Sequence, residues 1–209
     1  EPEPRATRVG AVSEPRHSTH KGSTPLIPTM RAGILVPPQN FGLVEDGLYR
    51  SGQPTELSYP FLEQLQLRTI LHLSADEPPA EFASWASEQR IQLVRLGAGA
   101  DANMLSPWKP VSEEVVVEGL RRVLDPSSYP LLVMCNLGRH RTGTLIGCLR
   151  KLQCWSLTSV LEEYRRHACA KSRHLNEQFI ELFDIDLVRV PEHSPLQLHL
   201  QAERGKPAG

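Results

Sequence analysis

The sequence lacks long hydrophobic runs, is poor in aromatic residues and shows no excess of one charge. Only 6% of its 209 residues are aromatic, and no stretch approaches the roughly 18 apolar residues that a membrane helix needs. The formal net charge is −1, so no global attraction to nucleic acid or to an anionic membrane is expected. The first residues also lack the apolar core of a secretory signal. We therefore expect a cytoplasmic protein that binds neither nucleic acid nor membranes.

Cysteine is scarce as well. Cys135, Cys148, Cys154 and Cys169 form no C-x2-C pair, and their neighbours show no convincing zinc-ligand spacing. Three of them are expected to be small core residues rather than ligands or disulfide partners. The small number of cysteines and the lack of pairing indicate a reducing compartment. We also expect no metal and no cofactor.

The two ends of the chain differ in composition from its middle. Residues 1–32 are rich in Pro, Ser, Thr, Arg and His and contain few large apolar side chains, so they are predicted to form a disordered tail. Residues 189–209 read similarly, as a C-terminal tail. Residues 33–188 are long enough to bury a core and are predicted to form one domain.

Within that domain, short apolar runs alternate with amphipathic segments. Strands are predicted over Leu43–Arg50 (a strand or hairpin), Thr69–Leu73, Ile91–Leu96 and Leu131–Met134. Helices are predicted over Ser58–Gln66, Ala80–Gln89, Ser112–Leu124, Thr142–Leu152, Leu157–His167 and Leu175–Asp186, with Ser58 and Ser112 as N-caps. The alternation favours an α/β fold with a mainly parallel central sheet flanked by helices. A ligand should then bind at the carboxyl ends of the strands.

The stretch PLLVMCNLGRHRTGTLIG (Pro130–Gly147) carries the clearest chemical signal. Its apolar run ends at Cys135, and Arg141 follows six residues later, just before a predicted helix. A loop between a strand and a helix N-terminus can aim backbone N–H groups at a phosphate, and the helix dipole adds positive potential there. This environment favours the thiolate form of Cys135, while Arg141 can hold two phosphate oxygens. The spacing therefore predicts a thiol that attacks phosphorus.

Two further residues of this stretch fit the same chemistry. Gly138 allows the loop to turn, and Thr142 could donate its hydroxyl to Cys135 when a phospho-cysteine is hydrolysed. A nucleotide-binding P-loop is a poor alternative, because Thr144 stands where such a loop needs lysine. A buried structural cysteine beside a surface arginine would leave the Gly and Thr-Gly positions unexplained.

The chain resembles the plant-and-fungal atypical dual-specificity phosphatases, cysteine-dependent enzymes of the protein tyrosine phosphatase superfamily. The resemblance rests on CNLGRHRTG, TLIGCLRKLQ, EEYRRHA, the stretch Val36–Ser74 and KSRHLNEQFIELFD (Lys171–Asp184). It implies a dual-specificity phosphatase-like fold, a phosphatase domain over 33–188 and a metal-independent reaction through a phospho-cysteine. It further implies phosphotyrosyl protein or inositol pyrophosphate as substrate, and a place in the oxidative-stress response.

The resemblance also predicts the site residues. Cys135 and Arg141 are the expected catalytic pair, and Asp101 is the expected general acid because it lies in the Gly-rich loop Gly97–Val111 upstream of the cysteine. Glu113 and Glu114 are weaker alternatives, since acids in a first helical turn already favour the helix dipole. The predicted phosphate-binding residues are Asn136, Leu137, Gly138, Arg139, His140, Thr142, Lys171 and Arg173.

One position departs from the superfamily pattern. Met134 stands where most members have a histidine that helps to order the loop and tune the thiol, and methionine cannot donate that hydrogen bond. We interpret this as a slowed phosphatase rather than an inactive one. The alternative is a phosphate-binding pseudophosphatase that acts as a subunit of a hetero-oligomer of related phosphatase-like proteins.

The charge around the motif bears on the substrate. Residues 139–174 contain eight Arg or Lys against Glu162 and Glu163, a local charge of 8 − 2 = +6. Such a surface suits a densely phosphorylated ligand better than a lone phosphotyrosine. Arg150, Lys151, Arg165 and Arg166 could instead lie on solvated helix faces.

Overall fold

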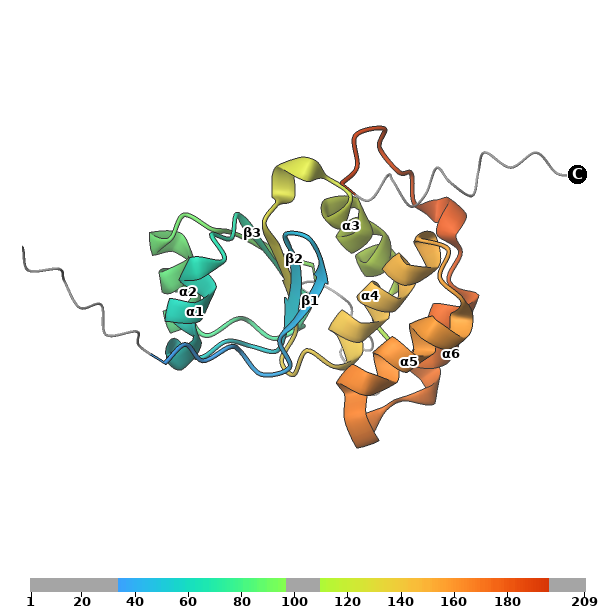
Figure 1. The fold of residues 1–209 in the computed structure, drawn as a ribbon, viewed down its shortest axis with the longest axis horizontal. Helices are drawn as coiled ribbons and strands as arrows, with labels where there is room; N and C mark the ends of the chain where they lie inside the picture. Colours follow the sequence, from blue (N-terminus) through green and yellow to red (C-terminus); the bar gives the residue numbers. More distant parts are fainter. Residues whose placement is uncertain (1–33, 97–109, 196–209) are drawn as a thin grey trace, which may run out of the picture. The chain divides into compact units, whose positions relative to one another are not determined.

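A five-stranded sheet forms the centre of the fold. The structure, a computed structural model, describes residues 34–96 and 110–195, within a unit that runs from Ile34 to Gly209. The strands are β1 (Gly42–Glu45), β2 (Leu48–Ser51), β3 (Thr69–His72), β4 (Gln92–Arg95) and β5 (Leu131–Met134), in the order β1-β2-β5-β3-β4 (Figure 1). β1 and β2 form an antiparallel hairpin, and the other three pairings are parallel. The predicted α/β fold with a mainly parallel sheet is confirmed.

Helices cover both faces of this sheet (Figure 1). α1 (Tyr59–Gln64) and α2 (Ala80–Glu88) lie on one face, and α3 (Glu113–Val123), α4 (His140–Leu152), α5 (Leu157–Ala168) and α6 (His174–Leu182) lie on the other. Short 3-10 helices occupy Glu56–Ser58, Pro126–Ser128, Cys169–Lys171 and Ile185–Leu187. No helix in the described ranges is long and apolar enough to cross a membrane.

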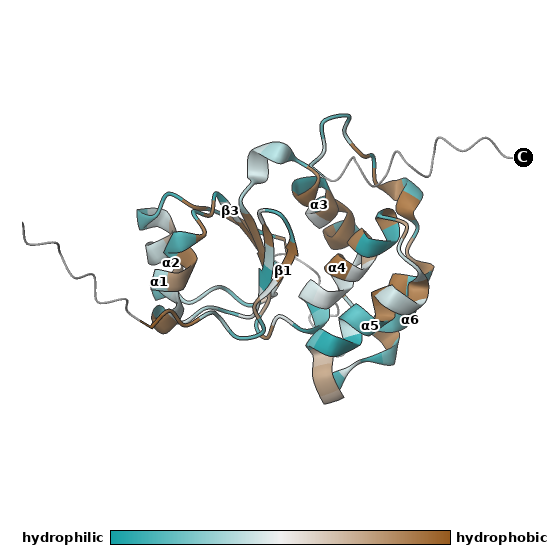
Figure 2. Ribbon diagram, viewed as in Figure 1, coloured by the Kyte–Doolittle hydropathy of each residue, from teal (hydrophilic) through white to brown (hydrophobic). Residues whose placement is uncertain are grey.

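The alternation of side chains along β5 divides the core into two layers. Leu131 and Val133 pack with α3–α6, whereas Leu132 and Met134 pack with α1 and α2, and all four are completely buried. Figure 2 shows the matching apolar colouring of the strands and of the helix faces turned toward them. Because β5 is buried on both faces, its run of four apolar residues has no polar position.

Three local predictions need correction. α4 begins at His140, two residues before the predicted start, because the N–H of Gly143 already bonds to the carbonyl of Arg139 at 3.0 Å. The hydroxyls of Ser58 and Ser112 do not cap the helices that follow them. The carboxylate of Glu114 instead accepts hydrogen bonds from its own backbone N–H and from the Ser112 hydroxyl, and these bonds, the backbone one first, lower its pKa.

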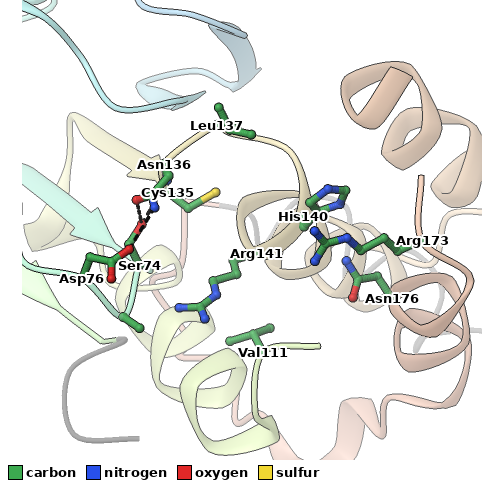
Figure 3. Close-up of a pocket in the computed structure, with 11 residues that line it drawn as sticks. Ser74, Asp76, Val111, Cys135, Asn136, Leu137, His140, Arg141, Arg173 and Asn176 are labelled. Atoms are coloured by element: carbon green, nitrogen blue, oxygen red, sulfur yellow. Dashed lines mark hydrogen bonds between the residues drawn. The ribbon is translucent and has the colours of Figure 1, made fainter. Parts of the chain in front are cut away.

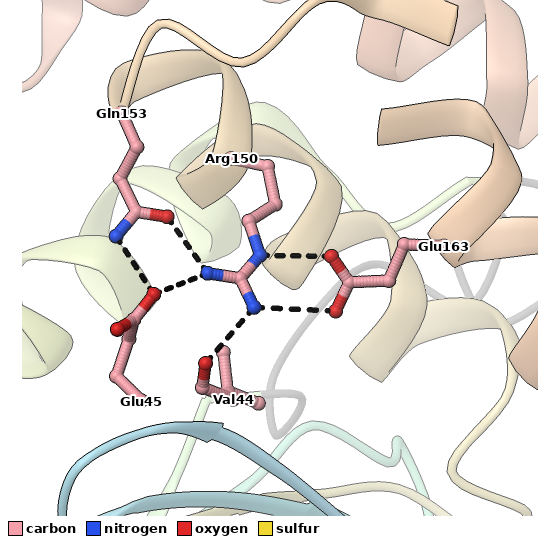
Figure 4. Close-up of polar contacts among 5 residues, drawn as sticks. All are labelled: Val44, Glu45, Arg150, Gln153 and Glu163. Atoms are coloured by element: carbon pink, nitrogen blue, oxygen red, sulfur yellow. Dashed lines mark hydrogen bonds and ion pairs between the residues drawn. The ribbon is translucent and has the colours of Figure 1, made fainter. Parts of the chain in front are cut away.

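Arg150 is a buried anchor and not part of a solvated helix face. Its side chain is 5% exposed and bridges α4 to α5 and to β1 (Figure 4). Nε lies 2.8 Å from Oε2 of Glu163, Nη2 donates to the carbonyl of Val44 at 2.9 Å, and Nη1 pairs with Glu45. The guanidinium also lies 4.2 Å from the ring centroid of Trp155. This network fixes the helical layer behind the loop that follows β5.

The structure describes only a short part of the two predicted tails. Residues 1–32 and 196–209 of the predicted tails lie outside the described residues. Residues 189–195, which the sequence assigns to the C-terminal tail, are described. Val190 packs against the core and Ser194 is buried.

Candidate active site

The parallel register brings three chain segments together at one edge of the sheet. Met134, the last residue of β5, lies opposite Ser51 of β2 and His72 of β3. The residues that follow these strands therefore emerge side by side at the carboxyl edge, where the predicted fold places a ligand. A pocket of about 330 Å³ opens there, and Cys135 lies among its lining residues (Figure 3).

The loop after β5 is held by groups that bond to its carbonyls. The carbonyl of Asn136 accepts from the N–H of Gln53 at 3.1 Å, and the carbonyls of Leu137 and Gly138 accept from Nδ2 of Asn40 at 3.3 and 2.9 Å. In a trans peptide each C=O points opposite to the next N–H. These contacts thus turn the N–H groups of Leu137 and Arg139 to the other side of the loop, as an anion-binding loop requires.

Gly138 meets a steric requirement that the sequence only suggested. Its φ is 65°, and a Cβ placed there would lie 2.5 Å from the backbone nitrogen of Gly52 and 2.5 Å from the carbonyl carbon of Ser51. The loop therefore packs directly against the backbone that leaves β2, which only glycine allows.

The segment after β3 supports the loop from the other side. The N–H of Asn136 donates to the Ser74 hydroxyl at 3.0 Å, and the Asn136 amide donates to the Asp76 carboxylate at 3.1 Å (Figure 3). Arg141 donates from Nη1 to the carbonyl of Leu73 at 3.0 Å. A guanidinium has five N–H groups, so this bond orients Arg141 and leaves other donors for a ligand.

Arg50 places a buried positive charge behind the loop. It is 1% exposed, and its Nη2 donates to the carbonyl of Gly138 at 3.2 Å. Burial outweighs the opposing effect of the nearby Glu163 and Cys135 and lowers the pKa of Arg50 to about 10, so the guanidinium stays charged at neutral pH. Its Nε and Nη1 have no hydrogen-bond partner within the described residues.

The opposite wall of the pocket is formed by the start of α4 and by the segment that leads into α6. His140, Arg173 and Asn176 line it (Figure 3). Burial, and to a smaller extent the charges of Arg173 and Arg139, lower the pKa of His140 to about 4. His140 is therefore a neutral imidazole at pH 7, beside a charged guanidinium.

The structure sorts the predicted site residues into three groups. Cys135, Asn136, Leu137, His140, Arg141 and Arg173 line the pocket. Gly138, Arg139 and Thr142 belong to the loop and the start of α4 without lining it, and Lys171 lies on an exposed 3-10 turn outside the lining. Asp101 lies outside the described residues, and its role stays a prediction.

Two further expectations can be compared with the geometry. The Thr142 hydroxyl is buried and has no hydrogen-bond partner among the described residues, so the bond to Cys135 is not formed here. Glu113 and Glu114 do not line the pocket; of the described residues, Asp76 is the carboxylate that does.

The local charge of +6 overstates the field at the pocket. Arg150 is neutralised by Glu45 and Glu163, and Arg165 pairs with Glu177 at 2.7 Å. Lys151 donates to the carbonyls of Glu181 and Phe183 at the end of α6. Of the eight bases counted in the sequence, Arg141 and Arg173 line the pocket.

The loop after β5 is held in place although Met134 replaces the usual histidine. Its side chain is completely buried in the apolar layer under α1 and α2. The hydrogen bonds that order the loop come from Asn40, Arg50 and Ser74 instead. These three residues, together with Asp76 and Asn176, were missed in the sequence. The sequence could have indicated Ser74 and Asp76, because they follow the predicted strand Thr69–Leu73, which ends at the same edge of the sheet as Cys135.

Within residues 34–96 and 110–195, no group of three or more His, Cys, Asp or Glu side chains could hold a metal ion. All four cysteines are free, and Cys148 is buried, but Cys154 and Cys169 are exposed, so the prediction of three core cysteines is wrong for these two. The described lining offers a thiol, two guanidinium groups, an imidazole, the carboxylate of Asp76 and the loop amides.

Comparisons with known proteins agree with this geometry. The model of the tyrosine phosphatase family Y_phosphatase2 matches residues 35–201. OCA1 of Mycosarcoma maydis, a protein named for tyrosine-protein phosphatase activity, is 53% identical over 156 residues, which cover 74% of this chain and 97% of that protein. The inositol diphosphatase DSP4 of Arabidopsis thaliana is 39% identical over 163 residues, which cover 78% of this chain and 79% of that protein.

A solved structure shares the fold at substantial identity. The core catalytic domain of the PP-IP phosphatase SIW14 from S. cerevisiae, in complex with citrate, superimposes with a TM-score of 0.66. The two chains are 41% identical, and the match covers 73% of this chain and 90% of that one.

Proposed function

Because this chain belongs to the tyrosine phosphatase family and is a cysteine-dependent phosphatase, we propose that its substrate is an inositol pyrophosphate. The observation that carries this proposal is a second cationic group in the pocket. Arg173 lines the same pocket as Cys135 and Arg141, but from the opposite wall. A substrate with a phosphate beside the one being cleaved would use both guanidinium groups.

The pocket residues suggest how the reaction proceeds. The Cys135 thiolate attacks phosphorus, and the bond from phosphorus to the leaving oxygen breaks. Arg141 and the N–H groups of Leu137 and Arg139 bind the remaining oxygens as negative charge develops on them. Water then attacks the phospho-cysteine and releases phosphate, which returns the thiolate.

The named activities of two relatives support an anhydride as the bond that is cleaved. DSP4 is named an inositol diphosphatase, and SIW14 a PP-IP phosphatase. A leaving phosphate needs less help from an acid than a tyrosyl or alkyl oxygen does. Such a substrate suits a pocket whose one described carboxylate, Asp76, is engaged by the Asn136 amide.

A phosphotyrosyl protein is the second candidate. Leu137 is 45% exposed at the pocket, and Val111 and Ala75 add apolar surface to the lining. An aromatic ring could pack there while its phosphate reaches Cys135. Asp101, or Asp76 in its place, would then have to protonate the tyrosyl oxygen. A phosphate-binding subunit of a hetero-oligomer remains a prediction from the sequence.

Phosphate release from diphosphoinositol pentakisphosphate and from a phosphotyrosine peptide separates these candidates. We expect the inositol compound to give the higher kcat/KM. We also expect Arg173→Gln to lower kcat/KM for it by about 10- to 100-fold, since a charge-assisted hydrogen bond contributes roughly 1.5–3 kcal/mol. Lys171→Gln is the matched control, because Lys171 lies outside the lining and should change kcat/KM by less than twofold.

Several outcomes would decide against the proposal. Preference for the peptide, with Arg173→Gln and Lys171→Gln behaving alike, would assign the pocket to phosphotyrosine. Phosphate release that is equally poor in wild type and Cys135→Ser, from every substrate, would favour the pseudophosphatase.

A further inference from the structure

The hydroxyl of Tyr164 joins three elements that border the pocket. Tyr164 lies on α5 and is 1% exposed. Its oxygen is 3.3 Å from Nδ1 of His140, 3.3 Å from the backbone nitrogen of Arg173 and 3.0 Å from Nδ2 of Asn176.

The donors that surround this oxygen indicate the direction of each hydrogen bond. The backbone N–H of Arg173 and the amide NH2 of Asn176 can only donate, so the phenolic oxygen accepts from both. Its single proton is then available for His140, whose Nδ1 must accept it. A neutral imidazole that accepts at Nδ1 carries its proton on Nε2.

The surroundings of His140 agree with a neutral ring. Burial is the main cause that lowers its pKa to about 4, and the charges of Arg173 and Arg139 act in the same direction. The ring lines the pocket beside Arg173 and Asn176 (Figure 3). With Nδ1 bonded to Tyr164, Nε2 is the ring nitrogen left for a ligand.

We propose that Tyr164 is a positioning residue that fixes His140 as the Nε2–H tautomer. His140 then offers a neutral donor to an anionic oxygen of the substrate next to the phosphate that Cys135 attacks. This use of the donor rests on the proposed function, whereas the tautomer itself does not depend on any substrate.

Nitrogen-15 NMR of the histidine side chains tests the tautomer directly. We expect the His140 ring of the wild-type protein to show a protonated Nε2 and an unprotonated Nδ1 at pH 7. Loss of its signals in His140→Gln assigns the resonances. A wild-type His140 protonated at Nδ1 overturns the proposal, because the ring would then donate to Tyr164 instead of accepting its proton.

Tyr164→Phe removes the hydroxyl and keeps the ring, which packs against Gly143 so closely that a Cβ there would lie 2.9 Å from Cδ2 of Tyr164. We expect the His140 signals to shift toward a mixture of tautomers. Tyr129→Phe is the matched control, since the Tyr129 hydroxyl donates to the carbonyl of Val123 at 2.7 Å and Tyr129 is not among the lining residues. An unchanged His140 tautomer in Tyr164→Phe also overturns the proposal.

Kinetics distinguish failure of this proposal from failure of the proposed function. For Tyr164→Phe we expect KM for diphosphoinositol pentakisphosphate to rise about 5- to 20-fold at nearly constant kcat. With p-nitrophenyl phosphate, which has no second phosphate, we expect less than a twofold change. A wild type that hydrolyses only p-nitrophenyl phosphate refutes the inositol pyrophosphate assignment but leaves the tautomer measurement valid. Equal losses on both substrates refute a role of His140 beside the cleaved phosphate.

Discussion

Replacing Gly138 with alanine should misplace the phosphate-binding loop without unfolding the protein. The backbone at Gly138 has φ 65°, a left-handed conformation that costs an L-residue roughly 1–2 kcal/mol. The new Cβ would also lie 2.5 Å from two backbone atoms of Ser51 and Gly52, whereas ordinary contacts begin at 3.4 Å. These atoms belong to the backbone that leaves β2 and cannot rotate away, so the loop must shift by about 0.9 Å (3.4 − 2.5 Å).

A shift of that size reaches the chemistry directly. The carbonyl of Gly138 receives bonds from Asn40 and Arg50, and the N–H of Arg139 follows it. Misplacing reacting groups by about 1 Å can lower a rate by about 100-fold. We therefore expect Gly138→Ala to lower kcat/KM for p-nitrophenyl phosphate by about 100-fold.

Gly47→Ala provides the matched control for Gly138→Ala. Gly47 has a similar φ of 68°, but its nearest contact would be Cδ1 of the Tyr129 ring at 3.2 Å. It should lose roughly 1–2 kcal/mol of unfolding free energy by urea titration and keep kcat/KM within twofold. A folded Gly138→Ala protein that retains more than half of the wild-type kcat/KM would refute the reasoning.

Three further predictions concern buried charge. Arg150→Ala should lower the unfolding free energy by about 3 kcal/mol in a urea titration, because it leaves the carboxylates of Glu163 and Glu45 without their partner; a loss below 1 kcal/mol contradicts this. Arg50→Met, which removes the charge and the bond to the Gly138 carbonyl, should lower kcat/KM about 10-fold, and Arg50→Lys should lower it less. Equal kcat/KM in wild type and both variants argues against a role of the Arg50 charge. His72 is 1% exposed, and burial, then Arg95, lowers its pKa to about 4. As the pH falls, the unfolded chain therefore binds a proton at His72 before the folded protein does. Up to about 3 kcal/mol of the unfolding free energy present above pH 6.5 is lost as the pH falls to 4. An unfolding free energy of the wild type that stays constant over this range in urea titrations would disprove this.

The sequence was sufficient for the architecture and for bringing Cys135 and Arg141 to one pocket. The apolar run before Cys135 identifies β5, because a strand that is buried on both faces consists of consecutive apolar residues. The end of that run marks the carboxyl edge of the sheet. The spacing of Cys135 and Arg141 then identifies the loop, since both residues belong to one contiguous segment.

The supporting residues could not be obtained in this way. Asn40, Arg50 and Tyr164 contact the loop or its neighbours from 98, 88 and 24 residues away in the chain, respectively, through bonds that depend on packing. The net charge of residues 139–174 did not predict the charge at the pocket for the same reason. In the sequence Arg150 resembles an exposed residue of a helix, but its partner Glu45 is 105 residues away. Ser112 appeared to be a cap, but its hydroxyl bonds to Glu114.

Trapping the reaction intermediate tests the central claim most directly. A rapidly acid-quenched reaction with diphosphoinositol pentakisphosphate, digested and examined by mass spectrometry, should yield phosphate on the peptide that contains Cys135. The Cys135→Ser protein should bind the same compound and release no phosphate. Phosphate on another residue, or release of phosphate by Cys135→Ser at the wild-type rate, would contradict the account.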